Sequence, residues 1–156
     1  AMARASRNDS SLAIFFIDLD SFKQINDDCG HNIGDTVLQE VAFRLQKCVR
    51  REDTFARICG DEFILLVENK SDVVELTLIA EKLQDTLVVP IVIEESDDSK
   101  NDGYQISASI GISIYPNDGL TTDELMECAD KAMYIAKSSK KSNIQFSNLE
   151  SVSIKQ

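Results

Sequence analysis

The apolar positions of the chain fall into short continuous runs and longer periodic stretches, which predict strands and helices respectively. Residues 12–18 (LAIFFID) form a continuous apolar run that ends in an acid. Such a run is typical of a central strand that is buried on both faces and whose carboxyl end reaches solvent. After an irregular stretch over 21–34, apolar residues recur at helical spacing from Val37 to Val49, which predicts a helix of about three turns.

Two short β-prone runs follow, over 54–58 and 63–67. The four residues between them, 59–62, include a glycine and two acids, a length and composition that favour a hairpin. We therefore expect Asp61 and Glu62 at the tip of a hairpin.

The second half of the chain continues the alternation of helices and strands. One amphipathic helix is predicted to begin at Ser71 or Asp72 and to end before Pro90, and another begins with a capping box of Thr121 and Glu124. The β-prone segments of this half are 91–93, 104–115 and 143–146, with a polar loop over 94–103. The alternation predicts an α/β fold in which helices cover a central sheet, without an internal repeat.

Composition limits the kinds of partner. The chain has 156 residues, 43% of them apolar, which fits one globular domain with a continuous core. Its net charge of −11 has the wrong sign for holding a nucleic-acid backbone, so we expect no nucleic-acid binding. A bound anion would need a cation or a local cluster of Lys and Arg to offset this charge.

The sequence also argues against membrane contact and against a disulfide framework. No stretch approaches the roughly 20 consecutive apolar residues that span a bilayer, and residues 1–10 lack the apolar core of a secretion signal. The four cysteines are scattered without a C-x-x-C pair, which favours a reducing compartment. We expect a cytoplasmic protein, or the cytoplasmic part of a larger membrane-attached one, with no direct membrane contact by this segment.

Acidic residues stand at two predicted chain reversals. Asp18 and Asp20 end the first strand, and Asp61 and Glu62 lie at the hairpin tip. If the two tips are neighbours, the carboxylates converge where no cationic side chain is adjacent in sequence, and they require a cation such as Mg²⁺. Taken singly, each pair is better explained as solvated turn acids, so the hypothesis depends on their combination.

Four ordered segments carry a resemblance to a known family. They are FIDLDSFKQINDDCGHNIGD at 16–35, RICGDEF at 57–63, SIGIS at 109–113 and ADKAMYIAK at 129–137. The sequence resembles the GGDEF-domain diguanylate cyclase family. The resemblance implies an α/β (α+β) fold like the palm of adenylyl cyclases and polymerases, with a central, mostly antiparallel five-stranded sheet surrounded by helices. It places this domain at 11–147, after the end of a truncated helix or linker at 1–10 and before a tail or linker at 148–156.

The resemblance also implies an activity and a metal site. Family members condense two GTP molecules into the second messenger cyclic di-GMP with loss of two pyrophosphates, and they use Mg²⁺ or Mn²⁺. By the family pattern Asp18, the carbonyl of Leu19, Asp61 and Glu62 hold the metal. Asp61 and Glu62 are also catalytic together with Lys137, and Asp61 can help to deprotonate the attacking 3′-hydroxyl.

Further residues match the family's nucleotide contacts. Asn26 and Asp35 resemble its guanine readers, and this fits their chemistry, since a carboxylate accepts from guanine N1–H and N2–H₂ while an amide meets O6 or N7. Without the resemblance, each would be explained as a turn, cap or helix-start residue. The residues matched to the triphosphate are Phe22, through its backbone, Lys23, Lys137 and Lys141.

An R-x-x-D pair formed by Arg50 and Asp53 matches the family's inhibitory product site, to which Arg57 would contribute. Guanidinium groups can clamp phosphates and stack on guanine, so cyclic di-GMP bound here would restrain the domain. The same pair is also explained by an arginine at a helix end with an acidic partner at i+3.

The sequence departs from the family pattern at two positions. Cys59 replaces the first glycine of the signature, where a Cβ is costly if the turn needs positive φ, and Lys141 stands where arginine is common. The alternative that Cys29, His31 and Cys59 bind zinc has no supporting ligand spacing.

The twofold symmetry of cyclic di-GMP implies two domains face to face, so a second GGDEF domain in a homodimer is the expected partner. The chain lacks the D-x-L-T-x-L-x-N-R segment that usually precedes the first strand, which predicts a fragment of reduced activity. The alternative function is a degenerate module that binds GTP or cyclic di-GMP and regulates an attached domain such as a phosphodiesterase.

Overall fold

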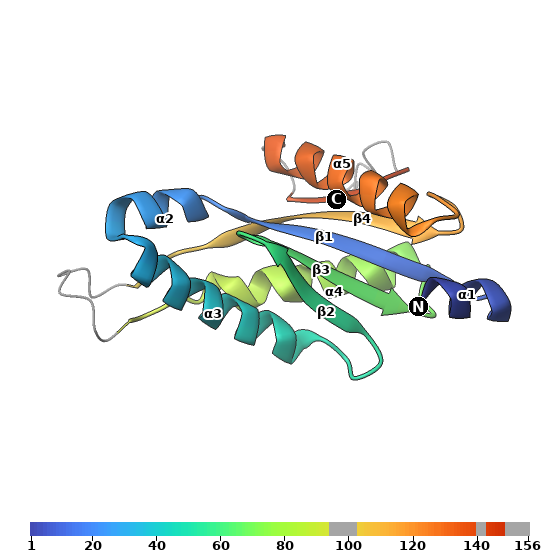
Figure 1. Ribbon diagram of the computed structural model, residues 1–156, viewed down its shortest axis with the longest axis horizontal. Coiled ribbons are helices and arrows are strands. Elements are labelled where there is room, and N and C mark those ends of the chain that lie inside the picture. The colour runs from blue at the N-terminus through green and yellow to red at the C-terminus, as the bar shows by residue number, and fades with distance from the viewer. Residues whose placement is uncertain (94–102, 140–142, 149–156) are drawn as a thin grey trace.

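The computed structural model describes residues 1–93, 103–139 and 143–148, and it contains one five-stranded sheet flanked by helices (Figure 1). The strands are β1 (Leu12–Asp20), β2 (Thr54–Cys59), β3 (Glu62–Glu68), β4 (Ser107–Tyr115) and β5 (Ile144–Phe146). The helices are α1 (Met2–Asn8), α2 (Phe22–Cys29), α3 (His31–Cys48), α4 (Val73–Val88) and α5 (Thr122–Ser138).

The strands lie in the order β2-β3-β1-β4-β5, so the first strand of the sheet in sequence is also its central one. β1 pairs antiparallel with β3 and with β4, β2 pairs antiparallel with β3, and β4 pairs parallel with β5. The predicted α+β fold with a mostly antiparallel five-stranded sheet is therefore confirmed.

The continuous apolar run of β1 is explained by helices on both faces of the sheet, because successive side chains of a strand point to opposite sides. Phe15 and Ile17 belong to the larger core cluster, which includes buried residues of α3 and α4. Ile14 and Phe16 pack with buried residues of α5. Figure 1 shows the same division, with α5 on one side of the sheet and α3 and α4 on the other.

The prediction of an irregular stretch over 21–34 is wrong. This segment forms α2 and the start of α3, separated by Gly30 with φ +86°. α2 has only eight residues and one fully buried side chain, Phe22, so the helical spacing of Phe22, Ile25 and Cys29 is too short a pattern to distinguish from an irregular stretch. Its partner contact is polar: the side chain of Asn26 fills the space in which a Cβ on Gly34 would lie.

Three other boundaries differ from expectation. The hairpin loop is two residues long, because Cys59 pairs with Glu62 and only Gly60 and Asp61 remain between β2 and β3. In the described residues, the predicted strand over 91–93 contributes an isolated bridge between Ile91 and Tyr104, and β4 begins at residue 107 rather than 104. Of the predicted polar loop over 94–103 and tail over 148–156, residues 94–102 and 149–156 lie outside the described residues.

The helix caps agree with the sequence. Of the two candidates for the first residue of α4, Asp72 is the cap, and its carboxylate accepts from the backbone N–H of Glu75 at 2.9 Å. Thr121 and Glu124 form the predicted capping box at the start of α5. Within the described part of the chain, no helix has both the length and the apolar character needed to cross a membrane.

Gly111 of β4 allows α5 to approach the sheet, and this contact yields a stability prediction. A Cβ at position 111 would lie 2.0 Å from the carbonyl oxygen of Ala129 and 2.2 Å from the backbone nitrogen of Met133. Since both are backbone atoms, α5 must move, and we expect Gly111→Ala to lower the free energy of unfolding by about 1–3 kcal/mol. Urea denaturation should show a lower midpoint with an unchanged slope.

The matched control is Ala56→Val, which adds methyl groups at an exposed position of β2. It should change the free energy of unfolding by no more than about 0.5 kcal/mol. Equal midpoints for Gly111→Ala and the unmodified chain would contradict the close β4–α5 contact.

Candidate active site

The two acidic chain reversals meet at one end of the β1–β3 pair. Asp18 is directly opposite Glu62 in the antiparallel register, and the backbone N–H of Leu19 donates to the carbonyl oxygen of Asp61 at 3.2 Å. Asp18 is buried, with 8% of its surface exposed, whereas Asp61 and Glu62 are half-buried. The predicted neighbourhood of the two tips is therefore confirmed.

The hairpin tip depends on one glycine and tolerates the cysteine beside it. Gly60 has φ +49°, a conformation that glycine adopts at little cost. Among the described residues, the non-glycine positions with positive φ are Asp9, Ser21 and Asn69, so Cys59 carries no such strain. The backbone strain that a Cβ would cause at a position with positive φ is therefore not present at Cys59.

The thiol of Cys59 contacts the acidic pair. Its Sγ donates a hydrogen bond to Oε2 of Glu62 at 3.0 Å, and this bond raises the pKa of the Cys59 thiol above its ordinary value. The thiol is consequently neutral at pH 7 and acts as a donor to the carboxylate rather than as a nucleophile.

A lysine far away in sequence supplies a positive charge at the site. Lys137 lies in the last turn of α5, and its Nζ donates to Oδ1 of Asp18 in an ion pair. The Asp18 side chain is 11% exposed and that of Lys137 is 43% exposed, so the pair lies at the edge of the buried region. The family resemblance placed Lys137 at this site as a catalytic and phosphate-binding residue, but its pairing with Asp18 was not predicted, because the two residues are 119 positions apart.

The charges at this site shift two pKa values. Burial raises the pKa of Asp18, and the negative charges of Asp61 and Glu62 add to the increase, while Lys137 opposes it. Burial lowers the pKa of Lys137, but the hydrogen bond and charge of Asp18, with a further contribution from Asp61, outweigh burial and raise it overall. Lys137 therefore remains a cation, held by a set of acids.

The donor atoms suit a hard cation. In the described part of the chain, no three His, Cys, Asp or Glu side chains come close enough to enclose a metal by themselves. Mg²⁺, however, is usually held by one or two carboxylates, with water and substrate phosphates completing its shell. Asp18, the adjacent carbonyl of Leu19 and the acidic pair on the hairpin offer such hard oxygen donors, so the residues present fit the predicted ion.

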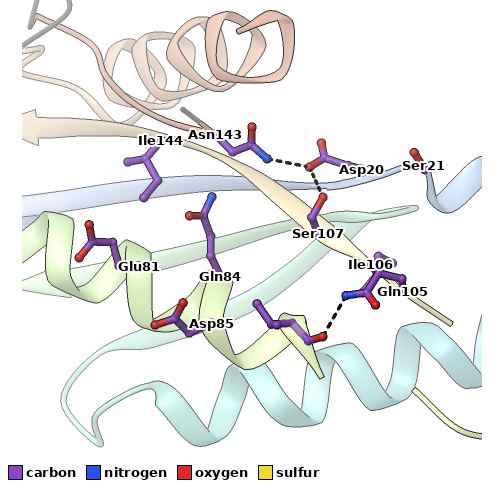
Figure 2. Close-up of a pocket in the computed structure, with 11 residues that line it drawn as sticks. Asp20, Ser21, Glu81, Gln84, Asp85, Gln105, Ile106, Ser107, Asn143 and Ile144 are labelled. Atoms are coloured by element: carbon purple, nitrogen blue, oxygen red, sulfur yellow. Dashed lines mark hydrogen bonds between the residues drawn. The ribbon is translucent and has the colours of Figure 1, made fainter. Parts of the chain in front are cut away.

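Asp20 has a different environment from Asp18, although the two residues point to the same face of β1. Its carboxylate accepts from the hydroxyls of Ser107 and Ser109, both at 2.7 Å, and from the amide of Asn143 at 3.4 Å. Figure 2 shows the Asn143 and Ser107 donors pointing at Asp20. Asp20 therefore links β1 to β4 and to the segment before β5.

These three partners of Asp20 were missed by sequence reasoning. Two of them were detectable in principle, because Ser107 and Ser109 alternate along the strand opposite Asp20 and Asp18. A cavity of about 610 Å³ lies beside Asp20 (Figure 2). Its lining includes Ser21, Gln84 and Gln105.

The two predicted guanine readers lie on the packed helices α2 and α3. Asn26 is half-buried, and its side chain contacts Gly34, the residue immediately before Asp35. Asp35 is exposed. The structure thus brings the two segments together and leaves the Asp35 carboxylate accessible.

The described residues that are predicted to contact phosphates come from the start of α2 and the end of α5. Phe22 and Lys23 form the first turn of α2, which follows β1 directly and has no side-chain cap. Lys137 approaches from α5. Lys141 lies outside the described residues.

The three residues of the predicted product site, Arg50, Asp53 and Arg57, do not share one set of contacts. The backbone N–H of Asp53 donates to the carbonyl of Arg50 at 3.2 Å, and Oδ1 of Asp53 accepts from the N–H of Glu68 at 3.3 Å. Burial raises the pKa of Asp53, and the charge of Arg50 opposes this shift. Arg57 instead donates from Nε to the carbonyl oxygen of Gly60 at 2.8 Å, so its guanidinium is held at the hairpin tip.

The alternative zinc site is wrong. Cys29, His31 and Cys59 all belong to the described residues, and they do not form a group that could hold a metal ion. Cys29 and His31 flank Gly30 at the α2–α3 junction, whereas Cys59 ends β2 at the hairpin.

Comparison with known proteins gives a consistent assignment. The family described as "Diguanylate cyclase, GGDEF domain" matches residues 1–143. The chain is 47% identical over 137 residues to MucR of Pseudomonas aeruginosa, a bifunctional diguanylate cyclase/cyclic di-GMP phosphodiesterase, covering 88% of this chain and 19% of MucR. It is 40% identical over 139 residues to the diguanylate cyclase TpbB of the same species, covering 88% of this chain and 30% of TpbB.

A solved structure agrees with both the fold and the sequence match. The crystal structure of the GGDEF domain of TpbB from P. aeruginosa superimposes with a TM-score of 0.85 at 35% identity, covering 95% of this chain and 89% of that domain. The chain spans less than a third of MucR and of TpbB.

The contact between Lys137 and Asp18 yields a prediction about ionisation. Lys137→Met removes the hydrogen bond and the positive charge that oppose burial, so the pKa of Asp18 should rise further. The carboxyl resonance of Asp18 in a ¹³C NMR pH titration would measure the change. Lys131→Met is the control, since Lys131 pairs with Glu127 on the same helix and should leave the Asp18 titration unchanged. A lower or unaltered Asp18 pKa in Lys137→Met would exclude the ion pair in solution.

Proposed function

The chain belongs to the GGDEF domain family of diguanylate cyclases, and from this membership we propose that it condenses two GTP molecules into cyclic di-GMP with release of two pyrophosphates. The observation that carries the proposal is the convergence of Asp18 with the Asp61–Glu62 pair beside the ammonium group of Lys137. A partly buried, anionic, oxygen-rich corner with one lysine ammonium suits phosphoryl chemistry that depends on a divalent ion.

Asp18, the carbonyl of Leu19, Asp61 and Glu62 would hold Mg²⁺, or Mn²⁺ in its place. The ion supplies positive charge that neutralises triphosphate oxygens in a protein whose net charge is −11. The residues' own contribution is rigid placement, because Asp18 and Glu62 are fixed opposite one another in paired strands and Leu19 is hydrogen-bonded to the hairpin tip.

Asn26 and Asp35 would read guanine from α2 and α3. A carboxylate that accepts from N1–H and N2–H₂ discriminates against adenine, whose donors and acceptors would leave it unpaired. The uncapped backbone N–H groups of Phe22 and Lys23 at the start of α2 favour an anion, and they would contact the triphosphate together with Lys137 and Lys141.

The reaction requires two copies of the domain. The 3′-hydroxyl of the GTP held by one domain attacks the α-phosphorus held by the other, and the same step in reverse orientation closes the ring. Asp61 would accept the proton of the attacking hydroxyl, since it is half-buried at the loop tip beside the metal ligands. A homodimer is therefore the proposed active species, acting in the cytoplasm, where GTP is available.

A second candidate function is supported by one observation at the signature. The thiol of Cys59 binds a carboxylate oxygen of Glu62, which is one of the proposed metal ligands. A domain weakened in this way would bind GTP or cyclic di-GMP without turnover and would regulate an attached domain such as a phosphodiesterase. The proposal of an attached phosphodiesterase is supported by the name of the relative MucR, a bifunctional diguanylate cyclase/cyclic di-GMP phosphodiesterase.

We also propose that Arg50 and Asp53 bind cyclic di-GMP as an inhibitor. Arg50 is exposed, and its i+3 partner Asp53 is anchored to the N–H of Glu68, so the pair has a defined geometry. Arg57 contributes less in this arrangement, because its Nε is already bound to the hairpin carbonyl.

The first functional prediction concerns Asp61. Asp61→Asn keeps the shape of the side chain but removes its charge, so we expect cyclic di-GMP formation from GTP and Mg²⁺ to fall about 100-fold or more. The assay uses the chain fused to a parallel coiled coil, with product quantified by chromatography and folding confirmed by circular dichroism. Asp130→Asn, which removes an exposed charge from α5, should retain full activity.

The outcomes separate the candidates. Turnover by the unmodified chain that is lost in Asp61→Asn supports the cyclase. Binding of GTP without turnover by the unmodified chain supports the regulatory module. Undiminished turnover in Asp61→Asn contradicts its proposed role.

The second functional prediction concerns inhibition by product. Arg50→Ala removes the exposed guanidinium, so the concentration of cyclic di-GMP that halves the rate should rise by about tenfold or more. Arg51→Ala changes the neighbouring arginine and should leave the inhibition curve in place. Identical inhibition curves for Arg50→Ala and the unmodified chain would contradict the proposal that Arg50 and Asp53 bind cyclic di-GMP.

A further inference from the structure

Lys137 occupies a position at Asp18 that a metal ion would also need. Its ammonium group binds Oδ1 of Asp18, the buried carboxylate at the end of β1. A carboxylate with 11% exposed surface, facing two further acids, is unfavourable without a cation, and in this state Lys137 is the cation provided.

We propose that Lys137 is an exchangeable counter-ion: it neutralises Asp18 before metal binding, yields the carboxylate to Mg²⁺, and is thereby released to contact the nucleotide phosphates. The proposal rests on the magnesium site proposed above. It adds that the protein's own lysine competes with the metal, so that metal affinity is low until an anionic ligand offers Lys137 another partner.

The environment of Lys137 supports competition rather than a permanent link. Besides Asp18, the charges of Asp61 and Asp20 also act on Lys137. Asp20 already accepts hydrogen bonds from neutral hydroxyl and amide donors, whereas the ammonium of Lys137 binds Asp18, one of the acids proposed to hold the metal. A divalent ion among Asp18, Asp61 and Glu62 would meet the same negative charge that now attracts the ammonium.

The mobility of the two partners differs. Asp18 is fixed in the central strand with neighbours on both sides, whereas Lys137 is in the last turn of α5 with 43% of its side chain exposed. The four-carbon stem of lysine can rotate without moving the helix, because α5 is anchored through buried residues such as Met133 and Ala136. The exchange therefore requires only a side-chain rotation.

Competition of this kind couples the two ligands. Mg²⁺ frees Lys137 for phosphate, and phosphate holds Lys137 away from Asp18, so each ligand raises the affinity for the other by the same factor. Mg²⁺ alone should bind weakly, and the metal should enter mainly together with the triphosphate.

The test measures Mg²⁺ binding to the nucleotide-free chain by calorimetry and by the amide resonances of residues 18, 19, 61 and 62. Lys137→Met removes the competitor, so its affinity for Mg²⁺ should be about three- to tenfold higher than that of the unmodified chain. Lys131→Met causes the same change in net charge on the same helix and should raise the affinity much less, because Lys131 pairs with Glu127. Lys137→Arg keeps the charge and should stay near the unmodified chain.

A measurement on the unmodified chain does not depend on any variant. During the Mg²⁺ titration the side-chain resonances of Lys137 should shift together with the amide of Asp18, as the ammonium leaves the carboxylate. Static Lys137 resonances, or an Mg²⁺ affinity of Lys137→Met no higher than that of Lys131→Met, would overturn the proposal, as would undetectable binding to Lys137→Met at millimolar Mg²⁺. None of these readouts involves turnover. The counter-ion proposal can therefore be contradicted while the cyclase assignment stands, and the cyclase assignment can be contradicted while the counter-ion proposal stands.

Discussion

The structure depends on one electrostatic constraint: a carboxylate buried at the end of the central strand must be matched by positive charge. Asp18 is surrounded by strands on both sides, and the antiparallel register with β3 brings Glu62 opposite it. The hairpin adds Asp61, hydrogen-bonded through its carbonyl to Leu19. Asp18 and Glu62 come from paired strands and the Asp61 backbone is hydrogen-bonded to Leu19, so the backbone holds these acids close together and a cation relieves their repulsion.

Local signals made much of the fold predictable. The caps at Asp72 and Thr121 and the glycine of the hairpin act within a few residues, so sequence reasoning located α4, α5 and the β2–β3 turn. By contrast, the apolar spacing of α2 extends over only eight residues, which is too short to distinguish from an irregular stretch, and the contact of Asn26 with Gly34 of α3 is tertiary. The apolar run over 91–93 was expected to be a strand, and in the described residues it contributes an isolated bridge between Ile91 and Tyr104.

The candidate site was predictable in its acids but not in their neutralisation. Asp18 and Asp20 are two residues apart and point to the same face of β1, yet one is paired with an ammonium group and the other with neutral hydroxyl and amide donors. The difference arises from which segments reach each residue: the end of α5 for Asp18, and β4 with Asn143 for Asp20. These partners are more than 80 positions away in the chain, so the D-x-D pattern alone does not distinguish Asp18 from Asp20.

At the signature, where Cys59 replaces the first glycine, the backbone and the side chain of the cysteine have separate effects. The hairpin places its positive φ at Gly60, and Cys59, which follows a register shift in the β2–β3 pairing, does not have positive φ, so the backbone of the turn does not require glycine at position 59. What the cysteine adds is a donor to one oxygen of Glu62. A thiol is a weak donor compared with an ammonium or a metal ion. The side chain of Cys59 therefore acts on the orientation of one carboxylate, that of Glu62, and not on the backbone of the turn.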